Sequence, residues 1–305
     1  MSKESQLTAA MQIEQIEFRC GEALAAHASF RIGGPADWLV RPDTPEKLCR
    51  AVALCREYQV PYYILGNGSN ILFGDAGYRG AVIDVTALTN DIHCEKQGDV
   101  TYVTVSAGCS LAKLCLFCRD CSLTGLEFAY GIPGTVGGAV YMNAGAYGGE
   151  MQQVLASARV LEADGTVHTV PAAALELSYR HSKLEETGGC VLAATVALQT
   201  GDLAAITARM NEVMQARRDK QPLDKPSAGS TFKRPQGAFA AALIDQCGLR
   251  GYRVGGAAVS EKHCGFVVNL GGATCADVLA LCDQVAAIVK EKTGYTLEKE
   301  VRVVQ

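Results

Sequence analysis

The chain contains 305 residues, of which 49% are hydrophobic and 20% charged, and its formal net charge at pH 7 is −4. Domains commonly hold ~100–200 residues, so the chain can form one large globular core or two to three smaller ones. The weak negative net charge produces no overall electrostatic attraction to nucleic acid or to an anionic membrane surface. We therefore expect a small molecule as the partner and predict no nucleic-acid or membrane binding.

The N-terminal segment and the thirteen cysteines indicate where the protein works. Residues 1–18 mix charged and apolar side chains and lack the continuous apolar segment of a secretory signal. No later stretch reaches the ~18 apolar residues of a membrane span. The cysteines lack the dense spacing of a small secreted domain, which is typical of thiols that stay reduced in the cytosol. We predict a cytoplasmic protein and expect it to be monomeric.

The first region, residues 1–88, is predicted to be an α+β domain. A helix is expected to begin at Pro45, to bury Leu48, Val52 and Cys55, and to end before Tyr58. With its neighbouring strands this helix forms a β-α-β unit. Strands are expected at residues 36–41, 60–65, 71–73 and 81–85.

A loop with the sequence GNGSN, residues 66–70, follows the second of these strands. Two glycines one residue apart allow close backbone approach and leave amide N–H groups free to face an anion such as a pyrophosphate. The loop is not a Rossmann fingerprint, because Ile71 stands where a third glycine is needed and a strand is expected to follow. Taken alone, the motif leaves an ordinary turn and a phosphate-binding loop as open alternatives.

The middle region, residues 89–201, is predicted to be mostly β. Residues 101–108 alternate with period two, residues 188–201 form one long apolar strand, and two strands flank the turn at Asp164 and Gly165. A glycine-dense segment, residues 131–150, lies between these strands. Its apolar side chains disfavour a flexible linker, so we expect its backbone to pass close to a large, flat ligand.

Three cysteines, Cys115, Cys118 and Cys121, have a spacing that overlaps that of iron–sulfur ligands. The fourth ligand is missing locally, because residue 125 is glycine and no Cys-Pro pair follows. Leu111, Leu114 and Cys118 share one face of a short predicted helix. Helix packing is favoured over a metal or cluster, and no metal is predicted.

The last region, residues 202–305, is predicted to be an α/β domain. Apolar side chains at helical spacing indicate helices. Gly248 and Gly294 are suited to end two of them, because glycine adopts the left-handed cap. Helices are expected at residues 203–220, 237–248 and 273–294, and strands at residues 265–270 and 297–304.

Several polar residues in apolar surroundings are candidates for chemistry: Arg180, Ser182, Ser230 and Glu300. Each alone is more often a solvated strand residue or a turn residue. No G-x-S-x-G motif surrounds Ser230, which disfavours a hydrolase, and the five histidines lack the spacing of a zinc site.

Six segments in this order resemble the UDP-N-acetylenolpyruvoylglucosamine reductase family over nearly the whole chain. They are HASFRIGGPADWLV (27–40), YILGNGSNIL (63–72), GIPGTVGGAVYMNAGAYGGE (131–150), LSYRHS (177–182), PSAGSTFKRP (226–235) and LEKEVR (297–302). The resemblance implies an α+β fold of the vanillyl-alcohol-oxidase type, with two FAD-binding α+β subdomains and a C-terminal α/β substrate-binding domain. It points to the shorter subtype, which lacks an inserted tyrosine-bearing loop in the C-terminal domain.

The resemblance also implies the cofactors and the site. FAD is expected to bind noncovalently, since neither glycine-rich segment contains a histidine for a covalent link. NADPH is expected to be the hydride donor and UDP-N-acetylglucosamine enolpyruvate the acceptor. The implied FAD-binding residues are Gly66, Asn67, Gly68, Ser69, Asn70, Ile132, Pro133, Gly134, Gly137, Gly138 and Asn143.

In the matching positions, Ser230 would donate a proton to the substrate, and Arg180 and Glu300 would bind and polarise its carboxyl group. Tyr179 and Lys220 complete the implied substrate site. A serine hydroxyl is a weak acid, so this role requires neighbouring groups such as Lys220 or Lys233. Two alternatives remain open, which are a flavin-linked sugar or hydroxy-acid oxidase of the same fold and a noncatalytic flavin-binding module.

Overall fold

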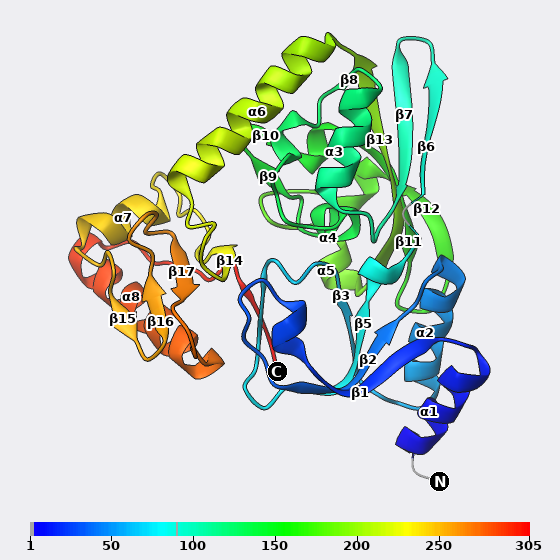
Figure 1. Ribbon diagram of the computed structural model, residues 1–305, viewed down its shortest axis with the longest axis horizontal. Coiled ribbons are helices and arrows are strands. Elements are labelled where there is room, and N and C mark those ends of the chain that lie inside the picture. The colour runs from blue at the N-terminus through cyan, green and yellow to red at the C-terminus, as the bar shows by residue number, and fades with distance from the viewer. Residues whose placement is uncertain (1–2, 90) are drawn as a thin grey trace. The chain divides into compact units, whose positions relative to one another are not determined.

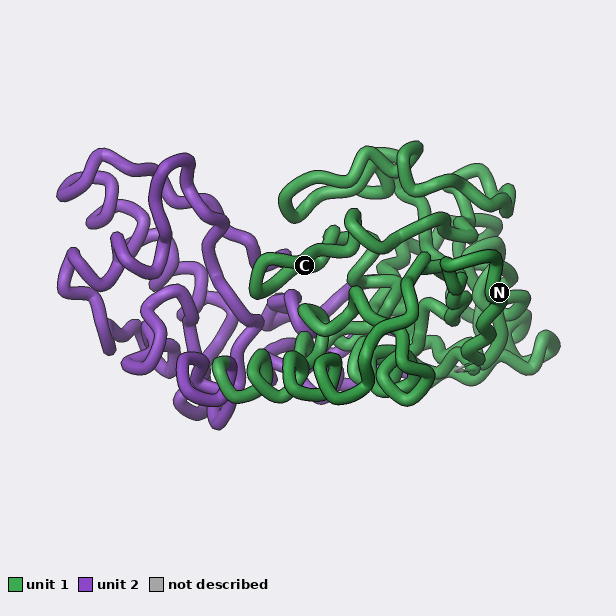
Figure 2. The backbone as a smooth tube through the Cα atoms, turned by 90° about the horizontal axis from the view of Figure 1, so that it is seen from above, with its two compact units in different colours: residues 1–19, 38–67, 80–216 green, residues 20–37, 68–79, 217–305 purple. Residues whose placement is uncertain are grey.

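The computed structural model describes residues 3–89 and 91–305. The chain forms two compact units, each of which the polypeptide enters more than once (Figure 2). Unit 1 contains Met1–Arg19, Trp38–Asn67 and Gly80–Ala216, and unit 2 contains Cys20–Asp37, Gly68–Arg79 and Arg217–Gln305. The borders predicted at residues 88/89 and 201/202 do not coincide with those of the units, so the three-domain division stays a prediction.

The N-terminal sheet has four strands in the order β1-β2-β5-β3, with β3 and β5 parallel (Figure 1). Helix α2 (Pro45–Glu57) connects β2 to β3, and helix α1 (Lys3–Ile13) packs against α2. The Thr44 side chain caps α2 by accepting a hydrogen bond from the Lys47 amide at 3.2 Å. The predicted helix and the strands predicted at residues 36–41, 60–65 and 81–85 are therefore confirmed, whereas β1 was not predicted. The strands are β1 (Glu17–Ala23), β2 (Pro35–Arg41), β3 (Tyr62–Leu65) and β5 (Tyr78–Asp84), followed by the 3-10 turn η2 (Val85–Ala87).

A six-stranded antiparallel sheet forms the centre of unit 1. Its main path runs β12-β11-β13-β7-β6, and β8 pairs with the end of β13. The turn between β11 and β12 is closed by Asp164, which accepts hydrogen bonds from the amide and the hydroxyl of Thr166, while Gly165 has a φ of +94°. The predicted hairpin and long strand are thus confirmed. The strands are β6 (Ile92–Gln97), β7 (Val100–Ser106), β8 (Leu123–Thr124), β11 (Leu155–Leu161), β12 (Val167–Pro171) and β13 (Cys190–Thr200).

Helix α3 (Leu111–Asp120) carries the three spaced cysteines. Leu111, Leu114, Cys115 and Cys118 are buried, whereas Cys121 caps the helix and is exposed. Burial raises the pKa of Cys118 to about 12, which keeps its thiol protonated at neutral pH. The prediction of helix packing is confirmed. Among the described residues, no group of three or more His, Cys, Asp or Glu side chains is arranged to hold a metal ion.

The glycine-dense segment contains a helix that the sequence did not predict. Helix α4 (Val136–Tyr141) begins after Thr135, whose side chain accepts a hydrogen bond from the Gly138 amide, and it packs on β13 and β7. A Cβ added at Gly137 would lie 2.9 Å from the Cβ of Ala107. Gly137 is therefore required for close packing within the protein, and not only for a ligand. Short elements nearby are η3 (Glu127–Ala129), β9 (Gly145–Ala146), β10 (Gly149–Glu150), η4 (Met151–Gln153), η5 (Ala172–Leu175) and α5 (Leu184–Thr187).

Unit 2 is built on a second four-stranded sheet, with the order β14-β17-β16-β15. Helix α8 (Cys275–Thr293) packs against β15, β16 and helix α7 (Ala240–Gln246). Strand β4, which follows the GNGSN loop, pairs in parallel with the C-terminal strand β18. The remaining elements are η1 (Leu24–His27), β4 (Ile71–Phe73), β14 (Ser227–Ser230), β15 (Arg253–Val254), β16 (Ala257–Val259), β17 (Phe266–Asn269) and β18 (Arg302–Val304).

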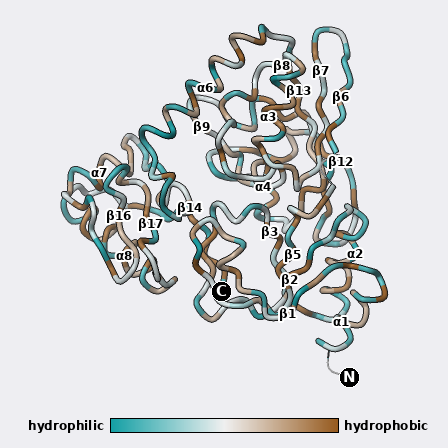
Figure 3. The backbone as a smooth tube through the Cα atoms, in the orientation of Figure 1, coloured by the Kyte–Doolittle hydropathy of each residue, from teal (hydrophilic) through white to brown (hydrophobic). Residues whose placement is uncertain are grey.

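Each unit has its own hydrophobic core, and Figure 3 shows apolar residues on strands such as β5 and β17. Helix α6 (Leu203–Lys220) follows Asp202 as predicted and buries Ile206, Met210 and Val213 on one stripe. No helix in the described part of the chain is both long and apolar enough to span a bilayer.

Two predicted elements are longer than those observed. The helix expected at residues 237–248 begins only at Ala240, because Gly237 has a φ of +76° and Phe239 is extended. The strand expected at residues 297–304 is limited to Arg302–Val304. Residues 298–301 instead hydrogen bond to residues 231–233, close in sequence to the candidate residue Ser230.

Candidate active site

The first half of the GNGSN loop contacts the glycine-dense segment within unit 1. The Asn67 side-chain amide donates a hydrogen bond to the carbonyl of Pro133 at 2.7 Å. A Cβ added at Gly66 would lie 2.5 Å from Oγ1 of Thr135, so only glycine allows this approach. Two segments that the sequence predicts to bind one cofactor are thus brought together.

The second half of the loop contacts the C-terminal segment within unit 2. Gly68 has a φ of +59°, and an added Cβ would lie 2.1 Å from the carbonyl oxygen of His27. The Asn70 side chain donates to the carbonyl of Glu300 at 3.1 Å, and the Arg302 amide donates to the carbonyl of Asn70 at 3.0 Å. A predicted cofactor residue is therefore bonded to the main chain of a predicted catalytic residue.

The loop has the unpaired donors that a pyrophosphate requires. Within the described residues, the amide N–H groups of residues 67–70 donate no hydrogen bond, although Gly68 is buried. Buried amides without partners are rare in proteins, and successive N–H groups in a tight loop form a site for an anion. The loop fits the diphosphate of FAD, and Gly66, Asn67, Gly68, Ser69 and Asn70 stay the predicted contacts.

The remaining predicted cofactor residues lie on or before α4. Ile132, Pro133 and Gly134 precede the helix, and Gly137 and Gly138 lie in its first turn. An added Cβ at Gly138 would meet only Thr135 Oγ1, at 3.4 Å, and Gly138 is exposed. Unlike Gly137, Gly138 has no packing contact that explains a missing side chain. It is the glycine of α4 best placed for a close approach by a ligand.

Arg180 lies in a tight turn. Ser178 and His181 exchange two backbone hydrogen bonds of 3.1 Å, and Arg180 has a φ of +56°. Its guanidinium donates to the carbonyl of Gly145 at 3.1 Å and lies 5.0 Å from the ring centroid of Tyr179. Tyr179 is 45% exposed. The two predicted substrate residues of unit 1 therefore form one stacked pair.

Asn143 and Ser182 attach this turn to the segment that follows α4. The buried Asn143 amide donates to the carbonyl of Ser178 at 2.9 Å and accepts from the amide of Gln152 at 2.9 Å. The buried Ser182 hydroxyl donates to the carbonyl of Tyr141 at 2.7 Å. Asn143 was predicted to bind FAD, and the structure places both polar ends of its side chain on protein atoms.

In unit 2, the segment that contains Glu300 pairs with the residues that follow Ser230. The Glu300 amide donates to the carbonyl of Thr231 at 2.8 Å, the Lys233 amide donates to the carbonyl of Glu298 at 2.8 Å, and a β-bridge joins Phe232 to Lys299. We call this pairing of residues 231–233 with residues 298–301 the catalytic ladder. Ser230, one residue before the ladder, ends strand β14 opposite Phe266.

The Ser230 side chain is half-buried, and its hydroxyl makes no hydrogen bond to any described residue. Lys220 is the last residue of α6 and is exposed. Lys233 forms an ion pair with Glu298, with an Nζ–Oε2 distance of 3.6 Å. Sequence reasoning missed the supporting residues Ser29 and Thr231. Ser29 donates to the carbonyl of Ser227 at 2.7 Å. Local sequence patterns do not predict contacts between residues so far apart in the chain.

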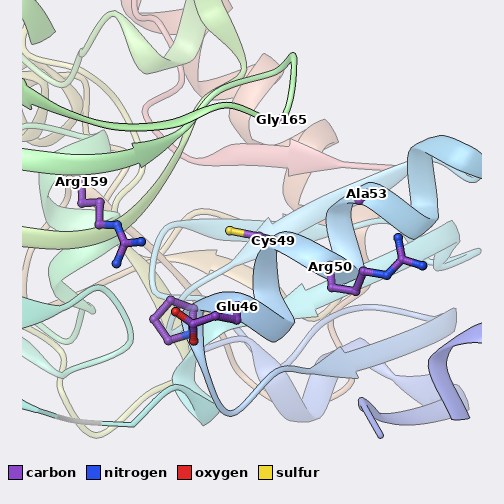
Figure 4. A pocket seen from close by; sticks show the side chains of 7 residues that line it. Glu46, Cys49, Arg50, Ala53, Arg159 and Gly165 are labelled. Carbon is purple, nitrogen blue, oxygen red and sulfur yellow. The ribbon is translucent and has the colours of Figure 1, made fainter. Parts of the chain in front are cut away.

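A pocket of about 410 Å³ lies elsewhere in unit 1, lined by α2, β11 and the turn at Gly165 (Figure 4). The side chains of Cys49 and Arg159 extend toward the same space. None of the predicted site residues lines it. Arg50, on its rim, is already paired with Glu14 at 2.8 Å. We assign this pocket no part in the site.

Two family models match the chain. The FAD binding domain matches residues 36–171, and the C-terminal domain of UDP-N-acetylenolpyruvoylglucosamine reductase matches residues 221–304. The first range contains both glycine-rich segments, and the second contains Ser230 and Glu300. Tyr179, Arg180 and Lys220 lie outside both matched ranges.

Curated relatives and solved structures agree with these models. UDP-N-acetylenolpyruvoylglucosamine reductase of Lachnoclostridium phytofermentans is 50% identical over 285 residues, which is 93% of this chain and 92% of the relative. The crystal structure of the reductase from Thermus caldophilus has a TM-score of 0.78 at 36% identity and covers 95% of this chain and 99% of its own.

A variant of berberine bridge enzyme has a TM-score of 0.51 at 14% identity, covering 65% of this chain and 44% of its own, and so shows the shared fold alone. The predicted FAD-binding α+β fold of the vanillyl-alcohol-oxidase type is confirmed. The chain belongs to the UDP-N-acetylenolpyruvoylglucosamine reductase family and is an FAD-dependent oxidoreductase.

Proposed function

We propose that this enzyme uses NADPH to reduce UDP-N-acetylglucosamine enolpyruvate to UDP-N-acetylmuramate, with Ser230, Arg180 and Glu300 as its catalytic residues. The names of relatives that match nearly the whole chain support the substrate and the reaction. The observation that supports the residue assignment is the catalytic ladder, which pairs the main chain of Glu300 with Thr231, the residue after Ser230, and which is bonded to the GNGSN loop through Asn70.

Bound FAD supplies the hydride chemistry that links NADPH oxidation to reduction of the enolpyruvyl double bond. The terminal vinyl carbon of the substrate gains a hydride, and the carbon that bears the ether oxygen must gain a proton. Negative charge develops on that carbon and its carboxyl group before the proton arrives. The protein must therefore bind this carboxyl group, stabilise the charge and deliver the proton.

Ser230 is the proposed proton donor. Its hydroxyl makes no hydrogen bond to any described residue, which leaves the proton available for a bound substrate. After donation the resulting alkoxide needs a cation, and Lys220 is the lysine of unit 2 whose matching position supports this role. Lys233 is less suited, since Glu298 already pairs with it.

Arg180 and Glu300 are proposed to bind and polarise the substrate carboxyl group, with Glu300 acting as the neutral acid, because two carboxylates would repel each other. A guanidinium has five N–H donors in a planar fork that suits a carboxylate. The stacked ring of Tyr179 and the bond to Gly145 orient the Arg180 side chain. Glu300 contributes from the ladder in unit 2, where its main chain is fixed by Thr231 and Asn70.

The proposal includes a monomeric enzyme in the cytoplasm. Its thirteen cysteines are all free, as is typical of proteins in a reducing compartment. Analytical ultracentrifugation should give a mass near 32.2 kDa. A mass of twice that value would contradict the monomer.

The reaction is tested by two anaerobic steps with purified protein, which should be yellow. NADPH should bleach the flavin absorbance, and the enolpyruvyl substrate should then restore it with formation of the lactyl ether. If only oxygen restored the colour, the protein would be an oxidase. If NADPH had no effect, a noncatalytic flavin-binding module would be supported instead.

A further inference from the structure

Arg180 has a backbone conformation that needs support from its surroundings. Its φ of +56° lies in the left-handed region, which is unfavourable for side chains other than those of glycine, asparagine and aspartate. Such strained residues persist where neighbouring contacts determine them, and they are concentrated at functional sites. The contacts that fix the turn of residues 178–181 therefore also fix where the guanidinium points.

Asn143 supplies the most specific of these contacts. It is 0% exposed and has a φ of +41°, a conformation that asparagine tolerates. One end of its amide donates to the carbonyl of Ser178, and the other end accepts from the amide of Gln152, each at 2.9 Å. A single side chain thus links the turn to the segment of residues 141–152.

Two more bonds join the same two segments. The Ser182 hydroxyl, also 0% exposed, donates to the carbonyl of Tyr141 at 2.7 Å. The Arg180 guanidinium donates to the carbonyl of Gly145 at 3.1 Å. Asn143 lies between these two acceptors in the sequence. The three bonds hold both ends of the turn and the guanidinium itself against one short segment.

We infer that Asn143 is a positioning residue, which holds the turn of residues 178–181 so that Arg180 presents its guanidinium to the substrate carboxyl group. This inference rests on the proposed function, because it requires Arg180 to bind that carboxyl group. Asn143 acts through Arg180 and contacts no substrate. Its effect on substrate binding should therefore exist only while Arg180 is present.

The test is a double-mutant cycle that measures binding of the product, which carries the same carboxyl group, to the flavin-loaded protein by calorimetry. The four proteins are the parent, Asn143→Asp, Arg180→Ala and the double variant. Asn143→Asp keeps the shape and the acceptor for Gln152 but removes the donor to Ser178. Ser182→Ala, alone and with Arg180→Ala, provides a second cycle if Asn143→Asp fails to fold.

We expect Arg180→Ala to weaken product binding at least about tenfold, through loss of a charge-assisted contact. Asn143→Asp should weaken it about three- to tenfold in the parent and less than about twofold in the Arg180→Ala background, since coupled residues are not additive. If Asn143→Asp weakened product binding by the same factor in the parent and in Arg180→Ala, the inference about Asn143 would be overturned, and the proposed role of Arg180 would stand. Unchanged binding in Arg180→Ala would overturn both the inference and the proposed role of Arg180.

Discussion

The two parts of the candidate site are held in place by different kinds of bond. In unit 2, Glu300 belongs to the catalytic ladder, in which main-chain amides bond to main-chain carbonyls, and Ser230 lies one residue before it. In unit 1, Arg180 lies in a left-handed turn attached by the side chains of Asn143 and Ser182. Main-chain bonds tolerate changes of side chain, whereas the Arg180 turn depends on individual residues. Substitutions that do not touch the substrate should therefore matter more in unit 1.

The largest expected effect comes from Ser230→Ala, which removes the proposed proton donor and leaves the ladder intact. Reduction of the flavin by NADPH needs no proton from Ser230, so its rate should stay close to that of the parent. Reoxidation by the enolpyruvyl substrate should slow ~10²–10⁴-fold, as is typical for loss of a general acid. Stopped-flow absorbance separates the two steps, and Ser230→Cys should recover part of the second. Reoxidation of Ser230→Ala at the parent rate would show that Ser230 is not the proton donor.

Glu300→Gln, in the same ladder, should have the next largest effect. Loss of a hydrogen bond to a charged group costs ~1.5–3 kcal/mol, which corresponds to a reoxidation rate about 10- to 150-fold lower. The neighbouring Lys299→Ala is the matched control, since Lys299 is paired with the exposed Asp283. That surface ion pair contributes at most ~1 kcal/mol to stability, and the control should reoxidise normally. Equal loss in both variants would indicate damage to the ladder.

Gly138→Ala tests the cofactor side of unit 1. A methyl group there is tolerated by the protein, and alanine is the better helix former by ~1 kcal/mol, so the unfolding temperature should not fall. FAD should nevertheless bind at least about fivefold more weakly if its approach to α4 requires glycine. Gly137→Ala is the control, because its Cβ would meet Ala107 and should destabilise the fold. FAD titration gives the affinity, and unchanged affinity in Gly138→Ala would remove Gly138 from the site.

The smallest functional effect is expected for Cys118→Ala. The small void should lower the free energy of unfolding by ~1–2 kcal/mol and leave flavin content and turnover unchanged. Stoichiometric iron or zinc in the purified protein would contradict the packing role.

The raised pKa of Cys118 adds a pH dependence to this variant. The thiol holds its proton more tightly in the folded state, so its contribution to stability is complete below the ordinary value of 9.0 and is lost as pH rises toward about 12. Raising the pH above 9.0 should therefore lower the free energy of unfolding more in the parent than in Cys118→Ala. Urea unfolding at each pH measures this free energy. Parallel stability curves would show that burial does not raise this pKa.

Local patterns predicted the elements with clear periodicity, such as β13, α6 and α8. They did not predict α4, since glycine has low helix propensity and the helix is stabilised by Thr135 and by packing on β13. The catalytic ladder joins segments about seventy residues apart, and the turn at Arg180 depends on Asn143 and Ser182. Such contacts arise from tertiary structure. The six ordered motifs supplied the candidate site residues, but the way each is held was visible only in the structure.

The contrast between the two parts is tested most directly by removing one hydroxyl from each. Ser182→Ala deletes a donor to the carbonyl of Tyr141 beside the Arg180 turn, and Ser29→Ala deletes a donor to the carbonyl of Ser227 in the strand that carries Ser230. Both bonds are 2.7 Å long, and the Ser29 hydroxyl also lies 3.3 Å from the carbonyl oxygen of Gly68. Product affinity of the flavin-loaded proteins should fall about three- to tenfold in Ser182→Ala, because the Arg180 turn loses one of the bonds that attach it and can move. It should change less than about twofold in Ser29→Ala, because main-chain pairing still holds β14. Equal losses, or a larger loss in Ser29→Ala, would contradict the account.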